Sequence, residues 1–340
     1  MTPRPSSRTR ARAPRASRRG RLRRTLLAAF AAGSVAVPVA GAAGASEAPA
    51  PAPAVLALPD SATSGELAVR YAAGRGDIRA AARAAEAHGA HKRAAALREL
   101  AAPERQFLSF DGRDGGRTVE IFGDLAQARR VAVLVPGADT SVDRYDRLRN
   151  SAEALLGELG EGSAVAAWVG YRTPATISTD AVTPDRADTG AAELVAFSAR
   201  LAKIRPAAHT TYLCHSYGSV VCARAARALT ADNLVLYGSP GTGVPNAGAL
   251  GTRATVWAGR GSADWIADVP HVSLELPLFT VGFGEDPTNP SYGARQFDAG
   301  DSDHSGYLKP GSVSLRSLAR IVDGADEADQ PHHAKAAGRA

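Results

Sequence analysis

The sequence predicts an α/β fold in which a mostly parallel central sheet is covered by helices on both faces. Two observations lead to this prediction. From residue 130 onward, short apolar runs that suit buried strands alternate with helical segments of about 10 to 15 residues. In addition, 45% of the 340 residues are hydrophobic and 22% are charged, a composition that supports a large buried core.

A secretory signal peptide is expected at the N-terminus, over residues 1–45. This stretch holds ten of the 40 basic residues, all of them arginines, and no acid, and its apolar run 25–39 is followed by small residues at A-x-A positions. Paired arginines also allow twin-arginine export. The net charge of +6 would fall to −4 after cleavage, which removes the indication of a nucleic-acid partner. No second long apolar run follows, so we expect no stable membrane anchor.

The next two segments connect this signal to the main domain. Residues 46–60 read as an Ala/Pro linker. Residues 61–101 predict a small N-terminal helical segment of two or three helices, with breaks at the glycines of 74–76 and at Gly89.

The main α/β domain is expected over residues 105–323, followed by a polar tail over 324–340. It begins with a hairpin, 106–110 and 118–122, whose turn is rich in Gly and Asp. The alternation that follows predicts strands at 130–135, 164–169, 210–213, 233–237 and 254–258 and helices at 145–159, 189–204, 219–229 and 312–322.

Ser216 is the candidate nucleophile. Of the three Ser-x-Gly steps, at Ser216, Ser239 and Ser291, only the first has an apolar strand before it and an apolar helix directly after it. This order is typical of a nucleophile elbow, a strained turn that lifts a serine hydroxyl above the sheet. Cys214 stands where such an elbow usually has its first glycine. The neighbouring His215 is expected to point away from the nucleophile.

A serine nucleophile needs a base and an acid that orients the base, and in elbow enzymes these follow the serine in the order acid, then histidine. Asp264 is our candidate acid because it lies in a Gly-rich loop directly after a predicted strand. Asp268 competes with it, but helix capping or a turn explains that residue. His304 is our candidate base because it lies in a polar loop before the last helix, whereas His271 starts a predicted strand.

An oxyanion hole is expected from two backbone N–H groups. One belongs to Tyr217, the residue after the nucleophile, and the other to Ala138, in the Pro-Gly loop after the first buried strand.

The chain resembles a secreted α/β-hydrolase family of high-GC Gram-positive bacteria. The resemblance covers about residues 105–323 and is carried by VAVLVPGADT (131–140), CHSYGSVV (214–221), VLYGSPGTGV (235–244), the Asp264-Trp265-Ile266 step and His304-Ser305-Gly306-Tyr307. It implies the α/β-hydrolase fold and a Ser216, Asp264, His304 triad, in agreement with the residue-by-residue interpretation. It implies no particular substrate.

Cys214 and Cys222 are the only two cysteines of the chain. The strand and helix that carry them run back along each other, so the two residues are expected at similar heights. Export would make oxidation possible. A disulfide and a pair of buried thiols both fit the sequence.

The sequence thus predicts a secreted serine hydrolase, a carboxylesterase that works through an acyl-enzyme on Ser216. Amidase, thioesterase or acyltransferase chemistry would use the same triad, and a non-catalytic binding protein on a hydrolase scaffold is the other class. The expected substrate is a small-molecule or lipid-like ester. The predicted lid, 170–188 with 278–297, is polar and favours a small or soluble ester over triglyceride. No metal or other cofactor is expected. His88 and His91 are three residues apart, a spacing that could suit a metal, but we expect them to lie on a solvated helix face. The sequence does not indicate an oligomeric state.

Overall fold

The computed structural model describes residues 49–54, 62–176, 178–269, 274–276 and 279–324. The expected signal peptide over 1–45 lies outside the described residues, as do parts of the linker and all of the polar tail from residue 325.

The core of the domain is an eight-stranded sheet with the order β1-β2-β4-β3-β5-β6-β7-β10. Its strands are β1 (Gln106–Asp111), β2 (Arg117–Gly123), β3 (Arg130–Val135), β4 (Ser163–Val169), β5 (His209–His215), β6 (Asn233–Tyr237), β7 (Thr255–Gly259) and β10 (Arg295–Gln296). β2 pairs antiparallel with β1 and β4, and every other neighbouring pair is parallel. The predicted mostly parallel sheet is therefore confirmed. The parallel strands end at one edge, where active sites of open α/β sheets lie.

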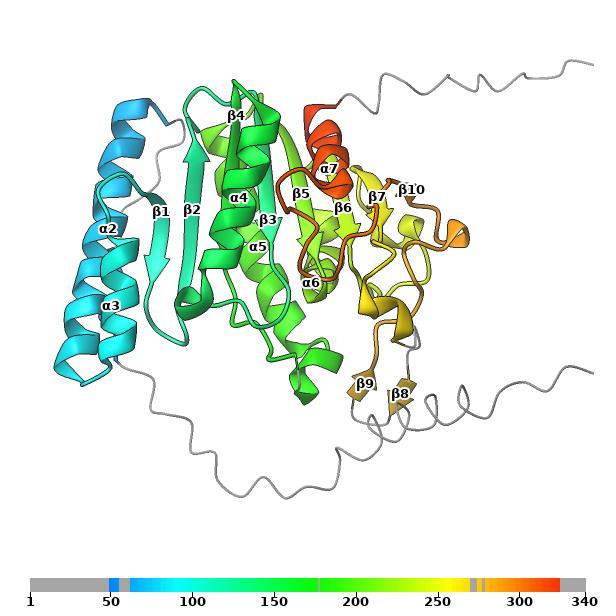
Figure 1. Cartoon of the computed structure of the whole chain (residues 1–340), viewed down its shortest axis with the longest axis horizontal. Coiled ribbons are helices and arrows are strands. Elements are labelled where there is room, and N and C mark those ends of the chain that lie inside the picture. The colour runs from blue at the N-terminus through cyan, green and yellow to red at the C-terminus, as the bar shows by residue number, and fades with distance from the viewer. Residues whose placement is uncertain (1–48, 55–61, 177, 270–273, 277–278, 325–340) are drawn as a thin grey trace, which may run out of the picture. The chain divides into compact units, whose positions relative to one another are not determined.

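Helices cover both faces of the sheet, as predicted. α4 (Asp146–Leu159) and α7 (Val313–Asp323) lie on one face, and α5 (Asp185–Ile204) and α6 (Tyr217–Ala225) lie on the other (Figure 1). The side chains of β3 alternate accordingly, with Val131 and Val133 in the cluster under α5 and α6 and Leu134 in the cluster under α4 and α7. The sheet is thus buried on both sides, which explains why its strands read as continuous apolar runs.

The N-terminal helical segment packs against the outer strand β1. It consists of two helices, α2 (Ser64–Ala87) and α3 (His91–Leu100). The predicted break at 74–76 was wrong, because α2 runs straight through it. A Cβ on Gly74 would lie 2.5 Å from the carbonyl oxygen of Phe107 in β1. This glycine therefore serves close helix–strand packing rather than a helix end.

The other differences from prediction concern element boundaries. α5 begins at Asp185, four residues before the predicted start, because its first turn is polar and acidic and lacks the apolar pattern of the rest. Acidic side chains suit a helix N-terminus electrostatically. β10 is only two residues long and was not predicted. The strand expected from His271 appears as β8 (Leu274–Leu276), paired with β9 (Phe279–Val281), while His271 itself lies outside the described residues.

Among the residues that the structure describes, no helix is long and apolar enough to cross a membrane.

Candidate active site

Ser216 lies in the sharp turn between β5 and α6. Its backbone has φ 52° and ψ −127°, a left-handed conformation that is uncommon for a residue with a Cβ. A Cβ on Gly218 would overlap the carbonyl oxygen of Val135 at the end of β3, so the turn needs glycine at this position. The turn raises the Ser216 side chain over the carboxyl edge of the sheet, where it lines a cavity.

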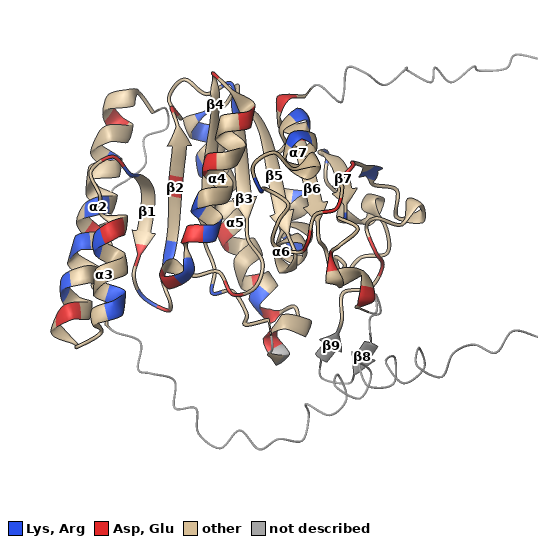
Figure 2. Ribbon diagram, viewed as in Figure 1, with Lys and Arg blue, Asp and Glu red and all other residues tan. Residues whose placement is uncertain are grey.

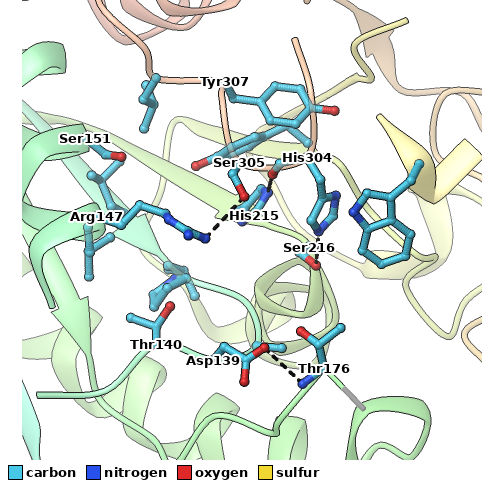
Figure 3. A pocket seen from close by; sticks show the side chains of 18 of the residues that line it. Asp139, Thr140, Arg147, Ser151, Thr176, His215, Ser216, His304, Ser305 and Tyr307 are labelled. Atoms are coloured by element: carbon cyan, nitrogen blue, oxygen red, sulfur yellow. Dashed lines mark hydrogen bonds between the residues drawn. The ribbon is translucent and has the colours of Figure 1, made fainter. Parts of the chain in front are cut away.

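Ser216, His304 and Asp264 form a continuous chain of hydrogen bonds. The Ser216 Oγ lies 2.9 Å from the Nε2 atom of His304 (Figure 3). The Nδ1 atom of His304 lies 2.8 Å from the Oδ1 atom of Asp264. Because an ionised carboxylate can only accept, Nδ1 carries the proton and Nε2 is free to accept the hydroxyl proton of Ser216. The geometry is therefore that of a nucleophile, a base and an orienting acid.

The Asp264 carboxylate is buried, with 3% of the residue exposed, and three donors surround it. The Tyr307 hydroxyl donates to Oδ2 at 2.6 Å, and the Ile266 backbone N–H joins His304 on Oδ1 at 2.9 Å. Burial alone would raise the pKa of Asp264, but hydrogen bonds from His304, Tyr307 and Ile266 outweigh it, so the pKa lies below its ordinary value. The carboxylate therefore stays ionised while it orients His304.

Three loops from distant parts of the sequence bring these residues together. Asp264 caps a short 3-10 helix (Trp265–Asp268) that follows β7, and His304 lies in the loop between β10 and α7. The competing residues lie elsewhere. Asp268 is exposed at the end of the 3-10 helix, Ser291 is exposed, and Ser239 is buried and hydrogen-bonded to Ser219.

The two residues whose backbone N–H groups are expected to form an oxyanion hole, Ala138 and Tyr217, lie on either side of Ser216: one in the loop after β3, the other directly after Ser216. Ala138 lines the cavity, and Tyr217 is the first residue of α6. Within the part of the chain that the structure describes, neither N–H has a backbone acceptor. The Tyr171 hydroxyl donates to the carbonyl oxygen of Pro136 at 2.8 Å and fixes the loop that carries Ala138.

The side chain of Tyr217 has a separate role in the scaffold. Its hydroxyl donates to the carbonyl oxygen of Thr183 at 2.7 Å and accepts from the backbone N–H of Ala187 at 3.1 Å. Burial raises the pKa of Tyr217 to about 12, so the hydroxyl remains protonated. Tyr217 thereby ties the elbow to the start of α5, inside the segment predicted as a lid.

His215 and Tyr307 belong to the site although sequence reasoning gave neither a role in it. The Nε2 atom of His215 donates to the backbone carbonyl of His304 at 2.7 Å, and the two rings lie 4.8 Å apart between centroids. Burial and the neighbouring His304 lower the pKa of His215 to about 3, so its ring is neutral. Tyr307 lies three residues after His304, in a motif that the sequence analysis noted, but nothing in its spacing indicates a bond to Asp264.

The cavity above Ser216 has a volume of about 490 Å³. This lies within the range of about 300–1,000 Å³ that is usual for small-molecule sites. Leu134, Leu148 and Tyr237 give it apolar walls, and Trp265, which is 48% exposed, lies at its edge with its ring centroid 4.6 Å from that of His304. The cavity therefore suits a small, partly apolar substrate.

Cys214 and Cys222 form a disulfide across the elbow, with their Cα atoms 6.4 Å apart. Both residues are fully buried. Cys214 occupies the position of the usual elbow glycine, and its side chain points into the packing between β5 and α6.

No group of three or more His, Cys, Asp or Glu side chains in the described part of the chain is arranged to hold a metal ion. The exposed His91 pairs instead with Glu86 at 2.7 Å.

The sheet order and the elbow between β5 and α6 are those of the α/β-hydrolase fold. Sequence comparison agrees, because residues 111–274 match a family model described as alpha/beta hydrolase. The chain is 31% identical over 259 residues to the uncharacterized protein Rv2079 of Mycobacterium tuberculosis, which covers 65% of this chain and 39% of that protein. It is 33% identical over 181 residues to the uncharacterized protein Mb0988c of Mycobacterium bovis, with 48% of this chain and 65% of that protein covered. The chain therefore has the α/β-hydrolase fold and is similar to mycobacterial proteins, of which it spans 39% of the first and 65% of the second.

Solved structures with a similar fold include a serine hydrolase without a lid from Xanthomonas campestris. It is 19% identical, with a TM-score of 0.44, over 68% of this chain and 98% of that chain. Another is the esterase PE8, which is 13% identical with a TM-score of 0.41, over 60% of this chain and 96% of that chain.

Proposed function

We propose that this protein is a serine hydrolase that cleaves carboxylic esters, with Ser216 as nucleophile, His304 as general base and Asp264 as the acid that orients His304. The observation that carries the proposal is the unbroken hydrogen-bond chain from the Ser216 Oγ through His304 to the buried Asp264 carboxylate. A scaffold without catalysis has no physical need for all three groups in this order.

The reaction would proceed through an acyl-enzyme. As the Ser216 Oγ attacks the ester carbonyl, His304 Nε2 takes the hydroxyl proton and the backbone N–H groups of Ala138 and Tyr217 stabilise the oxyanion. Collapse of the intermediate breaks the bond to the alcohol, which leaves with the proton from His304. Water, deprotonated by the same nitrogen, then releases the acid and restores Ser216.

The experiment that tests this proposal is hydrolysis of p-nitrophenyl acetate and butyrate by wild-type protein and by Ser216→Ala. Removal of the nucleophile is expected to lower kcat by about 10⁴-fold or more, since triad members act as a unit. Ser291→Ala is the matched control, because Ser291 is an exposed Ser-x-Gly serine outside the cavity. Equal turnover by Ser216→Ala and wild type would contradict the assignment.

Amidase, thioesterase and acyltransferase chemistry would use the same three residues. Transfer of the acyl group to an added alcohol rather than to water would identify an acyltransferase, and faster cleavage of an acyl-thioester than of the matched ester would identify a thioesterase.

We also propose that the protein is exported, with residues 1–45 as its signal peptide and residues 105–323 as its hydrolase domain. Two features support export: the charge pattern of residues 1–45 and a disulfide between Cys214 and Cys222, since disulfides persist mainly outside the reducing cytoplasm.

A further inference from the structure

One side of the cavity carries a cation that forms no ion pair with any acid in the described part of the chain. Arg147, in the first turn of α4, is the only Lys or Arg among the residues that line the cavity. Its Nη1 atom donates to the hydroxyl oxygen of Ser305 at 3.2 Å, and Ser305 directly follows the base His304 (Figure 3). Its guanidinium group therefore lies close to the reacting groups, and its one polar contact is with a neutral partner.

Three acidic side chains near Arg147 in the sequence are paired with other arginines, and Asp146, directly before it, is exposed and forms no ion pair with it. Asp139 lies 3.5 Å from Arg144, Asp143 lies 2.5 Å from Arg93, and Glu153 lies 3.0 Å from Arg149. Asp143 lies in the short 3-10 helix Val142–Arg144 that precedes α4, four residues before Arg147. None of the described carboxylates forms an ion pair with Arg147. Figure 2 shows both signs of charge along α4.

We propose that Arg147 is an anion subsite, and that the preferred substrates are small esters that carry a carboxylate in addition to the ester bond. A guanidinium group presents a planar fork of N–H donors that matches a carboxylate in a bidentate way. The hydroxyl groups of Thr140 and Ser151 also line the cavity and add further donors. This inference rests on the proposed function, because it names the substrate class of the same site.

The second charged residue of the cavity favours a carboxylate over a phosphate. Asp139 is the only Asp or Glu among the lining residues. Its oxygens already accept from the backbone N–H of Thr176 at 3.2 Å and face Arg144. An anion bound at Arg147 is repelled by the Asp139 carboxylate. This repulsion is weaker for the single charge of a carboxylate than for the nearly double charge of a phosphate monoester.

Two matched pairs of chromogenic or chromatographically resolved substrates test the proposal. In the first pair the carboxylate is on the acyl side: the mono-4-nitrophenyl ester of adipic acid against its terminal amide. In the second pair it is on the leaving group: 4-acetoxybenzoate against 4-acetoxybenzamide. The amides keep the size and polarity of the acids but lack the charge. The quantity measured is the ratio of kcat/KM for acid over amide in each pair.

We expect wild-type protein to prefer the acid by about tenfold in at least one pair, mainly through KM, because the contact is remote from the bond that breaks. Arg147 is solvent-exposed, so added salt should reduce the ratio. Arg147→Gln should bring the ratio to about one, and Arg147→Lys should retain part of it. Arg149→Gln, two residues along the same helix and outside the cavity, is the control that should keep the wild-type ratio.

A ratio near one in both pairs for wild-type protein, with normal turnover of p-nitrophenyl acetate, would overturn the anion subsite and leave the proposed function intact. An acid preference that persists in Arg147→Gln would also overturn it. If wild-type protein hydrolyses no ester at all, the proposed function fails, and the subsite fails with it.

Discussion

At the scale of single residues, the position of His304 depends on groups that do not touch the substrate. Tyr307 holds one oxygen of Asp264 and itself accepts from the Gly261 backbone N–H at 3.0 Å, so this hydroxyl links the acid to the loop after β7. His215 supports the backbone of His304 from the other side. Both are positioning residues, and both are neutral, since burial raises the pKa of Tyr307 well above its ordinary value and lowers that of His215.

Tyr307→Phe tests this positioning role. The variant removes one of the hydrogen bonds that lower the pKa of Asp264, so the pKa of this carboxyl rises. The proposed mechanism needs the ionised carboxylate, so activity should be lost at a higher pH than in wild type as the pH falls. We expect kcat/KM at neutral pH to fall about tenfold. The measurement is the pH profile of kcat/KM for p-nitrophenyl butyrate.

Tyr292→Phe is the matched control for Tyr307→Phe. The hydroxyl of Tyr292 is also buried and hydrogen-bonded, at 2.8 Å to Thr242, but it lies outside the cavity. An unshifted acid limb in Tyr307→Phe, or the same shift in Tyr292→Phe, would show that the bond to Asp264 does not position the base.

Ser216, Asp264 and His304 could be predicted as site residues from the sequence. Ser216 and Asp264 follow predicted strands, and His304 precedes the last predicted helix. Tyr307, His215 and Arg147 could not be chosen in that way. Their roles arise where three loops meet, and such contacts between distant segments leave no periodicity or spacing in the chain. In the sequence, nothing distinguishes Arg147 from other arginines on the exposed face of a predicted helix.

At the scale of elements, the packing of α2 on β1 shows where local reasoning failed. The pattern Gly-Arg-Gly at 74–76 is a helix breaker by composition. In the structure, however, the two glycines have different surroundings. Gly74 faces Phe107 at close range, whereas a Cβ on Gly76 would meet nothing within 4 Å. The strands β3 and β6 were predicted to the residue, because a strand that is buried on both faces is apolar over its whole length.

Gly74→Ala and Gly76→Ala form a matched pair that tests this packing. Gly76→Ala should raise the free energy of unfolding by about 0.5–1 kcal/mol, because alanine is the better helix former and the site is open. Gly74→Ala should lower it by about 1–3 kcal/mol, because the new Cβ pushes α2 away from β1. Urea denaturation of both variants measures the difference. Equal effects of the two substitutions would show that α2 is not closely packed at Gly74.

At the scale of the whole molecule, the distribution of charge separates the N-terminus from the rest of the chain. The net charge of +6 arises from the ten arginines of residues 1–45, and the remaining residues carry 30 basic and 34 acidic side chains. Figure 2 shows both signs interspersed along α2, α3 and α4. A mixture of both signs on these helices is unlike the clustered basic side chains that bind nucleic acid. The basic excess therefore supports the proposed export rather than a binding function.

Expression of the full chain in a high-GC Gram-positive host tests the export proposal. We expect protein in the culture medium whose N-terminal residue is Ala43 or Ser46, after cleavage at one of the A-x-A sites. Denatured without reductant, this protein should take up no thiol label, because Cys214 and Cys222 are bonded. The control variant Leu26→Arg/Leu27→Arg interrupts the apolar run and should remain in the cells. Intact chain from Met1 inside the cells, for the wild type as for the control, would contradict export.

The most direct test of the central claim is covalent labelling with a fluorophosphonate probe, followed by peptide mapping by mass spectrometry. In the proposed mechanism the hydrogen-bond chain to Asp264 activates Ser216, so the label is expected on this serine and should be strongly reduced in His304→Gln, which lacks the proposed base. A folded wild-type protein that takes up no label, or that carries it on Ser239 or Ser291, would contradict the claim that Ser216 is the nucleophile of a serine hydrolase.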